Sequence, residues 1–257
     1  MDSGSLEYNV IVVKWGNKFT PEHVNRLYRM AKRNITLPFN FYCYTEDPTG
    51  IYDEVNIISL DKSLNLEKWW WKLTLFKKNN LNQGINLFLD LDVVIQSNID
   101  HFFTKAKHKK ITLIDKDSIH ERDLPFLDLY YYDPKTFACY NSSIMVWYNN
   151  ENQDIFEKFI KNYKLYTKVY AGIDRFFSYE ISSSRFIGLD FNDYYYRNSL
   201  RPNEEEKNSY FIRLYKRTSY YTKPGRVKVY FNPNIPICVF NQHHEDVFYQ
   251  GMENFLL

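Results

Sequence analysis

Two aspartates interrupt a long apolar segment, and of all residues in this chain they are the best suited to do chemistry. The segment runs from Leu87 to Ile95, and Asp90 and Asp92 are the two residues that break its apolar character. Burying an unpaired ion is costly, so two charges in such a segment need a partner. Residues i and i+2 of a strand lie on the same side, so both carboxylates can converge on one divalent cation.

A simpler alternative is a strand that ends at Asp90 and leaves both carboxylates solvated in a turn. Apolar residues flank the pair on both sides, however, and turn-forming residues follow only at positions 96–100. We therefore favour a metal site at the carboxyl end of a buried strand. Hard carboxylate oxygens are the ligands that Mg²⁺ and Mn²⁺ prefer.

The size and composition of the chain indicate a globular protein with a substantial core. Its 257 residues are 44% hydrophobic and 25% charged, which fits one large α/β domain. The formal net charge of +2 argues against nucleic-acid binding through a broad basic surface. Aromatic residues make up 19% of the chain, and some of them could serve as a stacking surface for sugars or bases.

Cysteine use and the N-terminal sequence favour a soluble protein in a reducing compartment. Cys43, Cys139 and Cys238 are widely spaced and form no CxxC pair, which disfavours a disulfide framework and a cysteine zinc site. The first residues lack the basic and apolar regions of a secretory signal. No stretch approaches the roughly 18 apolar residues of a transmembrane segment. We therefore expect a cytoplasmic protein.

The order of predicted elements is that of a nucleotide-binding α/β domain with short connections. Residues 10–13 form a continuous apolar run that is typical of a buried parallel strand. A helix is expected after Thr20, which is a good N-cap in front of Pro21. Two more strands and a helix are expected at residues 39–44, 55–60 and 66–76. This alternation predicts a mostly parallel sheet.

The predicted helix at 66–76 would carry Trp69, Leu73 and Phe76 on one core-facing side. Ligands of such sheets bind at the carboxyl ends of the strands, where the connections diverge. The residues that follow the first two strands should therefore line the same crevice as Asp90. They are Lys14, Trp15, Thr45, Glu46 and Asp47.

Six segments in this order resemble those of GT-A glycosyltransferases, most closely the family-8-like nucleotide-diphospho-sugar transferases. They are residues 10–13, 44–47, 69–73, 88–92, 140–146 and 172–175. The resemblance covers roughly residues 8–190. It implies an α/β GT-A-like fold, with a mostly parallel central sheet flanked by helices, in a single catalytic domain over residues 1–257. The stretch from about 191 to 257 would be a C-terminal extension.

The resemblance also implies a metal-dependent glycosyltransferase that moves a sugar from a nucleotide sugar, with UDP as carrier, to a hydroxyl of a glycan or related acceptor. Asp90 and Asp92 would hold Mn²⁺ or Mg²⁺ against the diphosphate, with His243 or His244 as a third ligand. The Gly and Lys-Pro that usually follow such a histidine are missing here. Another cation would then hold the diphosphate, and the candidates are Lys223, Arg226 and Lys228.

In the resembling enzymes the donor contacts residues near the strand ends. The matching positions here are Val13, Lys14, Trp15, Thr45, Lys72, Asp90, Asn141 and Ser142. Asn141 and Ser142 would face the hydroxyls of the donor sugar, and Ser143 replaces the usual glycine. Asp174 would be the catalytic or positioning carboxylate, although Arg175 stands where the family has Gln.

Structural alternatives exist for each of these polar residues. Lys72 could extend from a core helix to solvent, Asn141 could satisfy local backbone groups, and Asp174 could be an N-cap. The stereochemical course is open, because an inverting enzyme needs a carboxylate base beside the acceptor hydroxyl. The candidates for that base are Asp115, Asp117, Asp174 and Glu180.

Two other function classes fit the aspartate pair. Phosphatases that form an aspartyl-phosphate also begin with a hydrophobic segment and Asp-x-Asp, and there the first aspartate, here Asp90, is the nucleophile. In those enzymes the motif usually follows the first strand, whereas here a strand-helix-strand unit precedes it. A sugar-binding protein without turnover, built on the same fold, is the other alternative.

Overall fold

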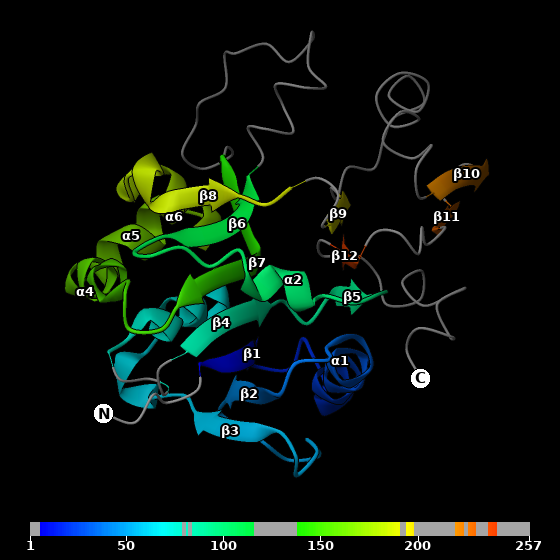
Figure 1. Cartoon of the computed structure of the whole chain (residues 1–257). Coiled ribbons are helices and arrows are strands. Elements are labelled where there is room, and N and C mark those ends of the chain that lie inside the picture. Colours follow the sequence, from blue (N-terminus) through cyan, green and yellow to red (C-terminus); the bar gives the residue numbers. More distant parts are fainter. Residues whose placement is uncertain are drawn as a thin grey trace, which may run out of the picture. The chain divides into compact units, whose positions relative to one another are not determined.

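The computed structural model describes residues 6–78, 81, 84–115, 138–190, 194–197, 219–223, 226–229 and 236–240 (Figure 1). The chain groups into two compact units. The first comprises Met1–Asn25, Leu37–Leu91 and Asp100–Leu189, and the second comprises Arg26–Thr36, Asp92–Ile99 and Asp190–Leu257. That the chain forms one catalytic domain stays a prediction.

Within the described residues, a seven-stranded mixed sheet forms the centre of the first unit, in the order β3-β2-β1-β4-β7-β6-β8. Its strands are β1 Glu7–Lys14, β2 Phe39–Thr45, β3 Asn56–Ser59, β4 Gly84–Leu89, β6 Ile111–Asp115, β7 Tyr140–Tyr148 and β8 Phe186–Gly188. Strand β7 runs antiparallel to β4 and β6, and the other four pairings are parallel. The predicted mostly parallel sheet is therefore confirmed.

The helical elements are α1 Pro21–Asn34, η1 Lys62–Leu64, η2 Lys68–Phe76, α2 Asp100–Phe103, α4 Gln153–Lys161, α5 Tyr163–Val169, α6 Ile173–Glu180 and η3 Ser183–Arg185. Helix α1 begins after Thr20, as predicted, and the Thr20 hydroxyl lies 2.9 Å from Nδ1 of His23. Its residues Val24, Leu27 and Ala31 recur at helical spacing and are fully buried.

Aromatic side chains fill the layer between the sheet of the first unit and the elements η2, α4 and α6. Helices α4 and α6 both contact η2, and α6 also contacts β7. The rings of Trp70 and Phe159 stack with centroids 5.3 Å apart, and Phe176 meets Phe159 edge-on at 5.6 Å. Such ring pairs add stabilisation beyond their buried area. This packing fixes η2 and the start of α6 against the strands.

The element predicted as a helix at 66–76 is a 3₁₀ helix, and its buried side differs from the prediction. A 3₁₀ helix has three residues per turn, so Trp70, Leu73 and Phe76 lie above one another, and all three are buried. Trp69 was expected on the core-facing side and is instead 37% exposed. Lys72 follows Trp69 by one 3₁₀ turn, so the two side chains share a different face of η2.

A row of asparagines crosses the first halves of the strands in the first unit. In register, Asn9 of β1 lies opposite Asn40 of β2 and Asn86 of β4. The side chains of Asn9 and Asn86 are fully buried, and Asn9 Nδ2 donates to Asn86 Oδ1 over 3.0 Å. Asn40 donates to Asn9 over 3.3 Å, and Asn86 donates to Asn149 over 3.4 Å. Buried amides that satisfy one another favour a single strand register.

The second unit contains a three-stranded sheet with the order β5-β12-β9, made of β5 Val93–Ile95, β12 Ile237–Phe240 and β9 Tyr194–Arg197. Strand β12 is antiparallel to β5 and parallel to β9. A hairpin pairs β10 Ser219–Lys223 with β11 Arg226–Val229. Among the described residues, no helix combines the length and apolar character needed to cross a membrane.

Candidate functional site

The aspartate pair lies just beyond the end of β4 and not within a strand. Strand β4 ends at Leu89, and residues 90–92 form the connection to β5. The expectation that Asp90 and Asp92 share one side of a strand is therefore wrong. The backbone N–H of Asp90 donates to the carbonyl oxygen of Ser143 over 2.9 Å, so it is anchored to β7. Asp90 belongs to the first unit and Asp92 to the second.

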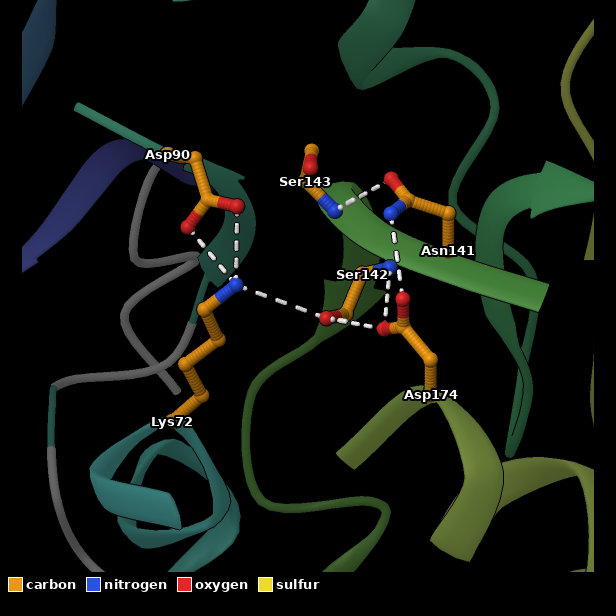
Figure 2. Close-up of polar contacts among 6 residues, drawn as sticks. All are labelled: Lys72, Asp90, Asn141, Ser142, Ser143 and Asp174. Atoms are coloured by element: carbon orange, nitrogen blue, oxygen red, sulfur yellow. Dashed lines mark hydrogen bonds and ion pairs between the residues drawn. The ribbon is translucent and has the colours of Figure 1, made fainter. Parts of the chain in front are cut away.

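Lys72 forms a two-pronged ion pair with Asp90 (Figure 2). Its Nζ lies 2.7 Å from Oδ1 and 2.8 Å from Oδ2 of Asp90, and 3.4 Å from the hydroxyl oxygen of Ser142. The side chains of Lys72 and Asp90 are 12% and 23% exposed. The lysine therefore points into the site. The alternative that Lys72 extends to bulk solvent is wrong.

Asp174, at the start of α6, is bound by two residues of β7. Its Oδ1 accepts hydrogen bonds from the backbone N–H of Ser142 over 2.9 Å and from the Ser142 hydroxyl over 2.7 Å. Its Oδ2 accepts one from the amide of Asn141 over 3.1 Å. The N-cap of α6 is Gly172, so Asp174 is not the N-cap that the alternative assumed. Its carboxylate connects α6 to the strand.

These contacts join the residues into one polar row, drawn in Figure 2. It runs from Asp90 through Lys72 and Ser142 to Asp174 and Asn141. Ser142 and Asn141 are only 1% and 4% exposed, so the row is largely shielded from water. Shielding strengthens electrostatic interactions with any charged group that binds there.

A second group of predicted residues lies where β1 and β2 end. Lys14 and Thr45 are paired in register, and both are almost fully buried. The Nζ of Lys14 lies 3.5 Å from the carbonyl oxygen of Asp47, and the Thr45 hydroxyl donates to the same oxygen over 3.1 Å. Trp15 and Val13 pack against the aromatic core. Because β1 lies between β2 and β4 and runs parallel to both, this group and Asp90 occupy the same edge of the sheet.

Several predicted residues fall outside the part of the chain that the structure describes, or are described only in their backbone. His243, His244 and Asp117 lie outside it, and Lys223, Arg226 and Lys228 are placed only as strand residues. Of the candidate bases, Asp115 ends β6 opposite Tyr140.

Glu180, the last residue of α6, is already engaged by neighbouring side chains. It accepts a hydrogen bond from the Tyr170 hydroxyl over 2.7 Å and pairs with Lys158 over 3.1 Å. Burial raises the pKa of Glu180, but the bonds from Tyr170 and Lys158 outweigh it and hold the pKa below its ordinary value. Such a carboxylate is a weak base.

The chemistry of the aspartates suits a Mg²⁺ or Mn²⁺ ion. These ions are commonly held by one or two carboxylates together with substrate phosphates, so a complete protein cage is not required. Asp90 and Asp92 supply hard oxygen ligands in the sequence that joins β4 to β5. Among described residues, no group of three or more His, Cys, Asp or Glu side chains is placed to hold a metal. An ion that binds Asp90 would share this carboxylate with the Lys72 ammonium, which contacts both of its oxygens.

Comparison with known proteins bears on the fold. No family model and no curated protein matches the sequence. Among solved structures, the galactosyltransferase LgtC in complex with donor and acceptor sugar analogues is similar, with a TM-score of 0.58 and 11% identity, over 96% of this chain and 93% of that chain. Mouse xyloside xylosyltransferase 1 is similar with a TM-score of 0.51 and 12% identity, over 92% and 98% of the two chains.

The bifunctional glycosyltransferase WbbM in its apo form is also similar, with a TM-score of 0.58 and 11% identity, and its match covers 98% of this chain and 50% of that chain. All three neighbours are glycosyltransferases by name. The fold of this protein is therefore that of the GT-A glycosyltransferases, as the sequence resemblance predicted. At these identities the likeness defines the fold, and the activity rests on the site.

Proposed function

We propose that this protein is a cytoplasmic, metal-dependent glycosyltransferase that moves a sugar from a nucleotide sugar, with UDP as carrier, to a hydroxyl of a glycan or related acceptor. The observation that carries the proposal is the polar row Asp90–Lys72–Ser142–Asp174–Asn141 at the carboxyl edge of a GT-A-type sheet. Two carboxylates, one ammonium and two neutral hydrogen-bonding side chains in a shielded site suit a ligand that combines a diphosphate with a sugar.

The diphosphate would bind at the end of the row that holds Asp90. When bound, Mn²⁺ or Mg²⁺ supplies Lewis-acid stabilisation of the charge that develops on the leaving nucleoside diphosphate. Asp90 and Asp92 would hold the ion, with His243 or His244 as a further ligand. The Lys72 ammonium, 2.7 Å from Asp90, is placed to contact a phosphate oxygen brought to that carboxylate.

The donor sugar would bind at the other end of the row. The Asp174 carboxylate accepts three hydrogen bonds from Asn141 and Ser142, and these bonds fix its orientation. A carboxylate held in this way can accept hydrogen bonds from sugar hydroxyls without reorganising. Asp174 is thus the proposed catalytic or positioning carboxylate, and the choice between retention and inversion is left to product analysis.

The nucleoside would lie against the ends of β1 and β2. Trp15 offers an indole for stacking on the base, and Val13, Lys14 and Thr45 come from the ends of the same two strands. Base stacking on aromatic side chains is favourable for any base, so Trp15 alone does not select uracil.

Of the two alternative functions, the phosphatase fits the site less well. A phosphatase would use Asp90 as a nucleophile, but both of its oxygens already contact the Lys72 ammonium. The three structural neighbours named above are glycosyltransferases. A sugar-binding protein without turnover would use the same residues, so a turnover measurement is needed to distinguish it from an enzyme.

The direct test is a thermal-shift panel of nucleoside diphosphates and UDP-sugars, each with and without Mn²⁺. At about 100 times the dissociation constant, binding adds roughly 2.7 kcal/mol of stability, which raises the unfolding midpoint measurably. We expect a Mn²⁺-dependent shift with UDP that is lost in Asp90→Asn and retained in Asp61→Asn, a change at an exposed carboxylate. No shift with any nucleotide would contradict the proposal. Release of UDP from a UDP-sugar then separates an enzyme from a binding protein.

A further inference from the structure

One large aromatic side chain beside the polar row has no role in the function proposed above. The 3₁₀ helix η2 contains three consecutive tryptophans, of which Trp70 and Trp71 are 5% and 3% exposed, whereas Trp69 is 37% exposed. In a 3₁₀ helix, residues i and i+3 lie above one another, so Trp69 and Lys72 share one face of η2. Trp69 therefore lies one turn along η2, roughly 6 Å along the helix axis, from Lys72, which forms the ion pair with Asp90.

The indole is also held against the start of α6. A Cβ atom at Gly172 would lie 3.0 Å from Nε1 and 3.4 Å from Cδ1 of Trp69, so the ring packs directly on the backbone of this glycine. Gly172 is two residues before Asp174 and is the N-cap of α6. Trp69 is thus one helical turn from Lys72 and packs on Gly172, two residues before Asp174.

The surroundings of Trp69 are polar as well as aromatic. The Nζ of Lys68 lies 5.6 Å from the centroid of the Trp69 ring, within cation–π range. Lys68 begins η2 with a left-handed φ of 54°, which is uncommon for a residue with a side chain and sets the direction in which η2 leaves the preceding loop. The site thus combines an exposed aromatic face with cationic groups on either side of Trp69 in sequence.

We propose that Trp69 is a stacking platform for a pyranose ring of the acceptor. The inference rests on the proposed function. A pyranose has an apolar C–H face that suits an indole ring and a hydroxyl-bearing edge that suits charged groups such as Lys72 and Asp174. The acceptor is favoured over the donor sugar because Asn141 and Ser142, the proposed contacts of the donor sugar, are almost completely buried. Trp69 is far more exposed and lies one turn from Lys72 along η2.

The test uses saturation-transfer NMR with three simple probes, methyl β-galactoside, methyl β-glucoside and methyl β-xyloside, in the presence of UDP and Mn²⁺. We expect at least one glycoside to receive saturation from the wild-type protein. Trp69→Ala should weaken that binding by about tenfold or more, as truncation of a central aromatic contact usually does. Trp69→Phe should retain part of it. Tyr52→Ala removes another exposed aromatic side chain, 38% exposed in the wild type, and should have no effect.

The same variants are placed in the UDP thermal-shift assay, and circular dichroism verifies that each is folded. A preserved UDP shift in Trp69→Ala together with lost glycoside binding supports the platform. Glycoside binding that is unchanged in Trp69→Ala, or no glycoside binding to the wild type, overturns it. If glycosides bind through Trp69 but no nucleotide binds, the proposed function fails while the sugar subsite stands.

Discussion

Removing the ammonium of Lys72 is the sharpest test of how the site is held together. In Lys72→Met the aliphatic stem remains, but Asp90 loses a cation at 2.7 Å. At an effective dielectric constant of about 20, this distance corresponds to a Coulomb attraction of roughly 6 kcal/mol before desolvation is subtracted. The two side chains are 12% and 23% exposed, so the pair is neither fully exposed nor fully buried. Exposed ion pairs contribute about 0–1 kcal/mol to stability, and breaking a buried pair costs about 3–5 kcal/mol. We therefore expect Lys72→Met to lower the free energy of unfolding by about 1–3 kcal/mol.

The assay is urea-induced unfolding at neutral pH in a double-mutant cycle with Asp90→Asn. The cycle should give a coupling energy of about 1–2 kcal/mol. Lys77 and Asp61 supply a control pair in the same protein, because their charged atoms are 3.6 Å apart and both side chains are 46% exposed. We expect no measurable coupling there. Equal coupling energies in the two cycles would refute the reasoning that burial strengthens the Lys72 pair.

The same substitution bears on metal binding. The ammonium occupies both oxygens of Asp90, so a divalent cation that approaches this carboxylate competes with it. In calorimetric titrations without nucleotide, Lys72→Met should therefore bind Mn²⁺ more tightly than the wild type. Weaker binding would mean that Lys72 assists the ion and does not compete with it.

Three further predictions concern the scaffold. Hydrogen bonds from Arg185 hold the pKa of Asp154 below its ordinary value of 3.8, so this pair stabilises the protein above that pH and ceases to do so as the pH falls through the lowered pKa. The difference in unfolding free energy between wild type and Asp154→Asn should accordingly be largest near neutral pH and vanish in strong acid, which urea titrations at several pH values measure. Burial raises the pKa of Cys43 to about 12, so at pH 8 only about one thiol in ten thousand is ionised, and Ellman's reagent should modify this residue only in denaturant. Asn86→Leu leaves the buried amide of Asn9 without its acceptor and should cost about 1–3 kcal/mol in urea unfolding.

The first three strands of the chain were predictable because they are short and bounded by turns. The run at 10–13 lies within β1, and the predicted strands at 39–44 and 55–60 match β2 and β3 within a residue or two. The direction of β7 was not predictable in this way. An apolar run has the same pattern in either direction, and the antiparallel pairing of β7 with β4 follows from connections that the pattern does not encode.

The 3₁₀ conformation of η2 was missed because three consecutive tryptophans fit α-helical and 3₁₀ spacing equally well. Helical spacing was assumed, and it placed Trp69 on the core-facing side. The tighter 3₁₀ winding places Trp70 there instead, since Trp70, Leu73 and Phe76 recur every third residue. An exposed tryptophan next to a polar site was therefore not visible in the sequence pattern.

The sequence named Lys72, Asp90, Asn141, Ser142 and Asp174 as candidate site residues, but it did not predict the contacts that they make with one another. Lys72 and Asp90 are 18 residues apart, and they meet because η2 packs beside the end of β4. Asp174 reaches Asn141 across 33 residues because α6 packs on β7. Such contacts depend on tertiary packing, so the spacing of residues in the sequence could identify the candidates and not the bonds among them.

The row of asparagines in the first halves of the strands has a consequence for how this scaffold could change over time. A shift of β1 by two residues would preserve its inward and outward pattern but would separate Asn9 from both Asn40 and Asn86. The alignment of the strands is therefore specified far from the loops that follow Lys14, Thr45 and Leu89. The loops after Lys14 and Thr45 could therefore change in length or sequence without loss of the alignment that keeps the strand ends together.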